Sequence, residues 1–345
     1  MKFGMQIPYA KRIDEAIAMA LALDKAGADV LWASEVYGFD APTLLGFLAA
    51  KTSRVMLGSA ILPIYSRSPA LIAQTAAGLD FVSGGRAILG LGSSGPQVIE
   101  GWHGMRFDRP LGRTREIVDI CRTVWRRDRL THEGIYDIPL PASEGTGLGK
   151  PLKLITRPVR EQIPIYLAAI GPANVELTAE IADGWLPMFF IPELAAGTWG
   201  DALAKGAARR SADLGALEVA ATVPIAIGDG TEELRELGRA SLALYIGGMG
   251  AKGKNFYNEL ACRYGYEAEA AAIQDLYLAG QREAAEARVP TELLEQTSLI
   301  GSATYVKERL AAFAAAGVTT LNLEPVGNAA DDPAHLLATL RELDA

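Results

Sequence analysis

The sequence predicts an α/β fold, a (β/α)8 TIM barrel with insertions. Two features indicate it: runs with helical spacing end in glycine directly before a short apolar run, and eight apolar runs can be marked along the 345 residues. A glycine just past a helix takes the left-handed conformation that closes the helix end, and a direct return to a buried strand is how a βα unit repeats. Five helical runs close in this way, at Gly27, Gly84–Gly85, Gly184, Gly215 and Gly317.

The eight apolar runs are the expected strands, and eight is the number that a closed parallel barrel requires. Most of them are continuous apolar stretches without polar alternation, which is typical of strands covered on both faces. They span residues 3–7, 30–35, 55–62, 87–92, 164–170, 185–190, 218–227 and 319–323.

Helical patterns fill the connections between these strands. We expect helices at residues 12–26, 42–51, 69–82, 113–126, 173–181, 198–214, 231–244, 267–287 and 302–316. Three connections are longer than a barrel loop needs, at residues 93–112, 128–163 and 228–299. Insertions in barrels usually build the rim of the active site or an oligomer contact. We therefore expect one domain over residues 1–345, with the Pro- and Gly-rich residues 139–151 as a mobile loop.

Composition and charge restrict the class of protein. Half of the residues are hydrophobic and 21% are charged, which is typical of a globular chain with a large core. The net charge of −8 argues against nonspecific nucleic-acid binding, and no apolar run is long enough to span a bilayer. The N-terminus enters a strand pattern without the features of a signal peptide, so we expect a cytoplasmic protein. Cys121 and Cys262 lie in separate helical patterns, and the sequence predicts neither a disulfide nor a metal site.

In barrels the functional groups lie at the C-terminal ends of the strands, which directs attention to the polar residues found there. Glu35 closes an apolar strand, where a carboxylate is costly unless it is solvated, ion-paired or acting on a ligand. His103 follows a glycine-rich turn, and it is either a site residue or a loop histidine with local partners. Gln6 and Glu324 also stand at strand ends.

Two glycine-containing turns at strand ends offer free backbone amides. Residues 90–95 add the hydroxyls of Ser93 and Ser94, which suits an anionic group or a flat ring, although a tight turn also requires glycine. Residues 171–174 place Pro172 in the first turn of a helix, so the amides there suit a phosphate or simply begin the helix. The sequence contains no nucleophile elbow, zinc-ligand spacing or dinucleotide fingerprint.

Taken together, the chain resembles the bacterial luciferase-like superfamily of flavin and deazaflavin barrel enzymes over nearly its whole length. The most specific part is the succession of residues 54–63, 67–74, 79–86 and 89–92. Within the superfamily, residues 94–97, 101–104 and 182–185 are similar to an actinobacterial group assigned to coenzyme F420, the 8-hydroxy-5-deazaflavin.

The resemblance implies a deazaflavin at the C-terminal mouth of the barrel, with its ring backed by strand three. Members often have a non-proline cis peptide bond in that strand, which would fall here at Ala60–Ile61 or one residue earlier. The residues implied to bind the cofactor are Ser59, Ala60 and Ile61 at the ring, and Gly92, Ser93, Ser94, Gly171, Pro172 and Ala173 near the phosphate.

The implied activity is hydride transfer between the deazaflavin and a small organic substrate, with the protein supplying position and a proton partner. Glu35, His103 and Tyr37 are the candidates for that partner. Related sugar-phosphate and alcohol dehydrogenases have a histidine where this chain has Val36, and the sugar-phosphate enzymes have a glutamate where it has Gly95. These two departures argue against both substrate classes.

Three alternatives remain open from the sequence. The first is a two-component monooxygenase that uses flavin mononucleotide (FMN), and the second is a noncatalytic flavin-binding protein. A metal-dependent barrel hydrolase would need histidines at strand ends, and no strand here ends in one. The helices expected near residues 41–50 and 69–79 are apolar on more than one face, which together with the resemblance predicts a homodimer or a higher homo-oligomer.

Overall fold

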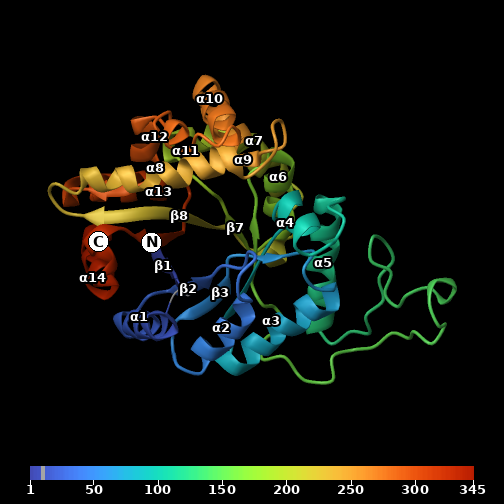
Figure 1. Ribbon diagram of the computed structural model, residues 1–345. Coiled ribbons are helices and arrows are strands. Elements are labelled where there is room, and N and C mark those ends of the chain that lie inside the picture. Colours follow the sequence, from blue (N-terminus) through green and yellow to red (C-terminus); the bar gives the residue numbers. More distant parts are fainter. Residues whose placement is uncertain (9–11) are drawn as a thin grey trace.

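Eight parallel strands close into a barrel, which confirms the predicted fold class (Figure 1). The computed structural model describes residues 1–8 and 12–345. The barrel strands are β1 (Lys2–Gln6), β2 (Val30–Ala33), β3 (Met56–Ser59), β5 (Ala87–Gly92), β6 (Ile165–Ala168), β7 (Gly184–Leu186), β8 (Glu218–Ile227) and β10 (Thr320–Pro325). They pair in this order, and β10 closes the ring because it pairs with both β8 and β1.

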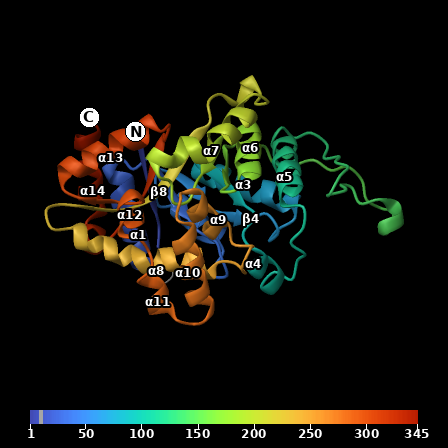
Figure 2. The same ribbon diagram turned by 90° about the horizontal axis from the view of Figure 1, so that it is seen from above.

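Helices surround the barrel, one for each strand of the ring (Figure 2). They are α1 (Ile13–Ala26), α2 (Ala41–Ala49), α3 (Pro69–Ser83), α5 (Pro110–Trp125), α6 (Pro172–Ile181), α7 (Pro192–Ala207), α13 (Ala303–Ala315) and α14 (Pro333–Asp344). The ring closes where α14 packs beside α1, and the N-terminal ammonium of Met1 forms an ion pair of 2.6 Å with Asp344. Both chain ends therefore lie on the same side of the molecule (Figure 1).

Glycine closes three of the ring helices as predicted. Gly27, Gly84 and Gly317 follow α1, α3 and α13 with φ of 84°, 69° and 88°. Gly184 does not fit this pattern, because it is the first residue of β7 and its φ is not positive. A Cβ at this position would lie 2.6 Å from the ring of Tyr166, so the glycine makes room inside the barrel.

The strand predicted at residues 55–62 is interrupted by a bulge. β3 pairs with β5 up to Gly58, opposite Ile88, and pairing resumes at Leu62 of β4 (Leu62–Pro63), opposite Leu91. Four steps along one strand (58 to 62) therefore face three along the other (88 to 91), which is one extra residue. The bulge brings the backbone of residues 59–61 to the mouth of the barrel.

The three long connections differ in structure. Residues 93–112 include α4 (Pro96–Gly101), and residues 128–163 form an arm with little regular structure that projects from the barrel in both views (Figures 1 and 2). The third connection holds α8 (Gly238–Ala243), a π-helical turn (Leu244–Gly248), α9 (Phe256–Arg263), α10 (Glu267–Leu278), α11 (Arg282–Glu286) and α12 (Thr291–Gln296). It ends in β9 (Leu299–Gly301), an additional strand that pairs with the end of β8.

Three expected helices differ in the structure. The one expected at residues 231–244 is α-helical only in α8, after a 3-10 helix at Glu232–Leu237. The helix expected at residues 198–214 begins earlier, at Pro192, and ends at Ala207. Gly215 has a φ of 63° but follows a 3-10 turn, so this stop signal belongs to the turn and not to α7. The helix expected at residues 267–287 divides into α10 and α11 at Gly280, whose φ is 79°.

None of the helices in the described residues is both long and apolar enough to cross a membrane. Cys121 and Cys262 are both free thiols.

Candidate active site

The register of the strands determines which side chains face the mouth. Trp32 Nε1 donates to Asn322 Oδ1 at 2.6 Å, and Trp32 packs on Tyr166 with ring centroids 5.7 Å apart inside the barrel. Successive residues of a strand point to opposite faces, so the residue two positions beyond an inward residue also faces inward. Ser34 therefore lies one layer above Trp32, and Glu324 lies one layer above Asn322.

Gln6 and Ser34 hold the bulge of β3 from inside the mouth. Gln6 Nε2 donates to Ser34 Oγ, and Ser34 Oγ donates to the carbonyl oxygen of Ala60 at 3.0 Å. The Ala60–Ile61 peptide bond is cis, at the position that the resemblance implied. The backbone on which we expect a flat ring to lie is thus fixed by hydrogen bonds from two neighbouring strands.

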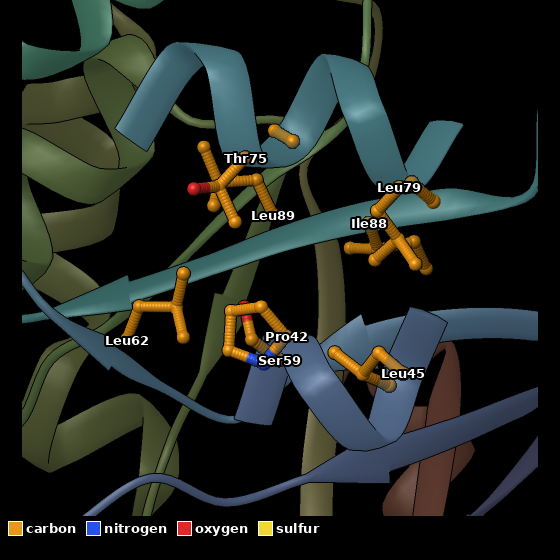
Figure 3. Close-up of a pocket in the computed structure, with 10 residues that line it drawn as sticks. Pro42, Leu45, Ser59, Leu62, Thr75, Leu79, Ile88 and Leu89 are labelled. Carbon is orange, nitrogen blue, oxygen red and sulfur yellow. The ribbon is translucent and has the colours of Figure 1, made fainter. Parts of the chain in front are cut away.

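Ser59 faces away from the mouth. Its side chain is 2% exposed, and its hydroxyl donates to the Gly90 carbonyl at 2.8 Å while accepting from the Gly90 amide at 2.9 Å. Figure 3 shows Ser59 among apolar side chains of α2 and β5, including Pro42 and Leu89, around a cavity of only about 10 Å³. Ser59 therefore braces the bulge against β5, and its hydroxyl does not reach the mouth.

Glu35 forms a buried ion pair at the rim. Its carboxylate receives Arg67 Nη1 at 2.6 Å and Nη2 at 2.8 Å, and Oε2 also accepts the Ala41 amide at 2.9 Å. The Glu35 side chain is 7% exposed and the Arg67 side chain 14%. Hydrogen bonding to Glu35 raises the pKa of Arg67. Glu35 thus joins the end of β2 to the start of α2, and both of its oxygens are engaged.

The other two predicted proton partners lie in two different loops, Tyr37 after β2 and His103 after β5. The Nε2 atom of His103 is buried and has no hydrogen-bond partner among the described residues. Tyr37 is 65% exposed, and its ring lies 6.5 Å from that of Trp102, next to His103. The structure therefore brings the loop after β2 and the loop after β5 together on one rim, with an unpaired imidazole nitrogen beneath.

The two turns predicted to bind phosphate are open to a ligand to different degrees. Ser94 has a φ of 57°, and α4, which begins just after it, is only six residues long. Gly171 precedes α6 without any side-chain cap, and Pro172 occupies the first turn. In this first turn Pro172 has no amide hydrogen and the Asn174 amide donates to the Gly171 carbonyl, so among the described residues the Ala173 amide is the group left to bind an anion.

The sequence did not single out Arg263, which lies beside this helix start. Arg263 Nη2 donates to the Ile170 carbonyl at 3.1 Å, while Nη1 is buried without a partner among the described residues. Burial lowers the pKa of this guanidinium. Arg263 belongs to α9 in the third insertion, 93 residues from Ile170 along the chain, so no local signal connected the two.

The third insertion also supplies an aromatic wall that sequence reasoning missed. Tyr245, on the π-helical turn, contacts Tyr257 of α9 and Phe189 of the loop after β7, with ring centroids 4.7 and 5.3 Å away. The Tyr264 hydroxyl donates to the Phe189 carbonyl at 2.8 Å and fixes that loop. Burial raises the pKa of Tyr245, and the nearby Glu324 adds to the shift, which places this wall over the end of β10.

No group of His, Cys, Asp and Glu side chains in the described residues is arranged to hold a metal ion. An apolar groove of about 830 Å³ lies between α7 and α13. It is lined by residues at the start of β7 and just before β8, so it opens at the end of the barrel opposite the mouth.

A sequence profile described as luciferase-like monooxygenase matches residues 1–320. The chain belongs to the luciferase-like monooxygenase family. The resemblance found in the sequence is confirmed. A Mycobacterium tuberculosis relative, which carries the provisional name coenzyme F420-dependent oxidoreductase, is 42% identical over 93% of this chain and 94% of its own length.

Solved structures of family-like barrels share the architecture. The coenzyme F420-dependent tetrahydromethanopterin reductase from Methanopyrus kandleri superposes with a TM-score of 0.78, at 22% identity, over 98% of this chain and 97% of its own. The oxygenating constituent of 3,6-diketocamphane monooxygenase from Pseudomonas putida, in complex with FMN, gives 0.63 at 20% identity over 99% and 96%. The luciferase-like fold alone therefore accommodates both kinds of cofactor.

Proposed function

We propose that this chain is a coenzyme F420-dependent oxidoreductase that transfers hydride between the deazaflavin and a small organic substrate. The observation that carries the proposal is the uncapped N-terminus of α6 beside Arg263 Nη1, which has no partner in the described part of the chain, on the same rim as the β3 bulge. This arrangement fits a flat ring with a phosphate-bearing tail. The 42% identical relative named for F420 supports the deazaflavin over FMN.

Different residues of the chain bind the ring and the phosphate of the cofactor. The backbone of Ala60 and Ile61, held by Gln6 and Ser34, backs the ring. Gly92 leaves this wall bare, because a Cβ there would lie 3.0 Å from Ile61. The amides near Ser93 and Ser94, and that of Ala173 at the α6 N-terminus with Arg263, hold the phosphate. When bound, the deazaflavin supplies the hydride chemistry, and the protein supplies position and a proton.

An FMN monooxygenase is the alternative function, because an FMN-containing enzyme has the same fold. A noncatalytic flavin-binding protein is a further alternative, which the open substrate side of the mouth does not favour. A homodimer and a small-molecule substrate are part of our proposal. The two free cysteines fit a reducing compartment, and we place the protein in the cytoplasm.

The test is an equilibrium titration of the purified protein with oxidised F420 and, in parallel, with FMN, followed by fluorescence. We expect preferential binding of F420. Arg263→Met should weaken that binding roughly tenfold or more, since a charged hydrogen bond contributes about 1.5–3 kcal/mol. Arg282→Met, at an exposed position on α11, is the control and should bind as the wild type does. Preferential binding of FMN would move the function to a monooxygenase, and binding of neither would refute the proposal.

A further inference from the structure

We propose that Glu324 is the proton partner of the reaction and that it faces a neutral, unsaturated substrate with a carbonyl or imine heteroatom. The inference rests on the proposed function, because it assigns the proton that accompanies hydride transfer.

The position of Glu324 follows from the barrel itself. Asn322, two residues earlier on β10, points inward to Trp32, so Glu324 points inward one layer higher, at the C-terminal end of the strand. Its neighbour on β8 is Pro224, which offers no side-chain donor. No hydrogen bond or ion pair of the Glu324 carboxyl is present among residues 1–8 and 12–345. The carboxyl is therefore free to meet a ligand in the mouth.

The Glu324 carboxyl is partly desolvated by surrounding protein atoms and is also accessible to water. It is exposed at the C-terminal end of β10, yet desolvation by surrounding atoms raises its pKa. A general acid needs both properties, because it must hold its proton at working pH and recover it after each turnover. The open mouth supplies the water for that recovery.

The other candidates lack one of these properties. Both oxygens of Glu35 are engaged by Arg67 and by a backbone amide, so proton transfer there would break a buried ion pair. His103 Nε2 is shielded from water and, within residues 1–8 and 12–345, has no hydrogen-bond partner to relay a proton. Among these carboxylate and imidazole groups, Glu324 alone is unpaired and open to solvent.

The wall beside Glu324 indicates the chemical class of the substrate. Tyr245 lies near the Glu324 carboxyl and packs against the rings of Phe189 and Tyr257, and the β3 bulge lies on a strand farther around the barrel. Aromatic surface favours a planar or unsaturated body. A protonated carboxyl favours a neutral heteroatom that accepts a hydrogen bond, which indicates carbonyl or imine compounds.

Glu324 exchanges one proton with the substrate heteroatom in either direction of the reaction. During reduction the substrate carbon gains the hydride, the C=O or C=N electron pair moves to the heteroatom, and that atom takes the proton from the Glu324 carboxyl. The O–H bond of the acid breaks, a heteroatom–H bond forms, and water returns the proton to the carboxylate. During oxidation the Glu324 carboxylate accepts the proton from the hydroxyl or amine as the hydride leaves the carbon.

Dicyclohexylcarbodiimide tests this assignment on the whole protein without F420. It is a neutral C=N compound that reacts only after a carboxylic acid protonates its nitrogen, so it repeats the proposed proton transfer. We expect mass spectrometry to find Glu324 labelled ahead of other carboxyl groups near neutral pH. The labelling rate should fall as the pH rises through a pKa above the ordinary glutamate value, because only the protonated form reacts.

Glu324→Gln should remove this label, Glu324→Asp should retain it, and Glu342→Gln, an exposed change on α14, should leave it unchanged. An unlabelled Glu324 in the wild type, or a pH profile like that of exposed carboxyl groups, would overturn the assignment. This result is independent of whether F420 binds, so the failure of the proposed function and the failure of this inference are distinguishable.

Two further readouts separate a proton partner from a structural residue. Glu324→Gln should bind F420 within about twofold of the wild type, and a much larger loss would make Glu324 a cofactor contact instead. With reduced F420 and cyclohexanone, cyclohex-2-enone or 1-pyrroline as acceptor, any reaction seen should slow at least ~100-fold in Glu324→Gln. An unchanged rate in that variant would also overturn the assignment.

Discussion

Glu35 forms an ion pair with Arg67, a residue from another part of the chain. The sequence showed only that Glu35 closes a strand, and the structure shows what its carboxylate binds. Glu35 was predicted as a proton partner because a carboxylate that closes an apolar strand needs a reason to be there. The bidentate contact with Arg67, 32 residues later, supplies one reason, since it satisfies both oxygens. Whether Glu35 also acts on a ligand stays a prediction, and its first effect is to hold the rim together.

Arg67→Met should lower the free energy of unfolding by about 3 kcal/mol, because it leaves the Glu35 carboxylate buried without its counter-ion. The double variant with Glu35→Gln should be less destabilised than the sum of the two single variants, since no buried charge remains. Urea unfolding measures both effects. Arg12→Met, which removes an exposed pair with Asp14, is the control and should change little. Additive effects of the two single variants would contradict this account.

At the scale of elements, glycines of the barrel strands determine the shape of the floor beneath the mouth. Trp32 and Tyr166 fill the barrel only because small residues oppose them on neighbouring strands. A Cβ at Gly58 would collide with the Trp32 ring, and one at Gly4 would lie 2.6 Å from Asn322 Oδ1. Gly78 in the ring helix α3 has no such function, because no atom lies within 4 Å of a Cβ added there.

Gly58→Ala should therefore destabilise the protein by about 1–3 kcal/mol, because the Trp32 ring cannot move without disturbing the packed interior. Gly78→Ala is the matched control. It lies within α3, has no atom within 4 Å of the added Cβ, and should stabilise the protein by roughly 0.5–1 kcal/mol. Thermal and chemical unfolding of both variants measures the contrast. Equal effects would show that the barrel interior is not close-packed at Trp32.

At the scale of the whole molecule, apolar side chains on α2 and α3 remain uncovered. Phe47, Leu71 and Phe81 are 43%, 47% and 67% exposed, respectively. Their helices belong to the ring on the side from which the arm of residues 128–163 projects, and that arm carries Leu148 and Ile155 at 83% and 95% exposure. A surface of this kind is typical of a contact between protein chains.

We expect light scattering coupled to size exclusion to give twice the chain mass of 36.6 kDa. Phe81→Asp combined with Leu71→Asp should shift the protein to monomers, because each change places a charge in the apolar contact. Leu237→Asp, at a position on the third insertion that is 60% exposed, should leave the mass unchanged. A monomeric wild type would refute the homodimer.

The sequence by itself determined the barrel, the position of its mouth and the kind of cofactor to expect. Local patterns carry this information, because apolar continuity marks buried strands and a glycine in the left-handed conformation marks a helix end. The helix start at Pro172 was located from its own segment, whereas the cofactor and the cis bond, expected at Ala60–Ile61 or one residue earlier, came from the resemblance of short segments to the family.

Only the tertiary structure decided which groups face one another across the mouth. Ser59 faces the helices because it follows Gly58, which faces Trp32 inside the barrel, and a continuous apolar strand does not show in its sequence which residues point inward. Arg263 and Tyr245 belong to the third insertion. Its helical pattern does not indicate that their side chains lie at the mouth of the barrel. Trp32 and Asn322 meet although 290 residues separate them. Contacts of this kind depend on how whole elements pack, which the periodicity of a single segment does not record.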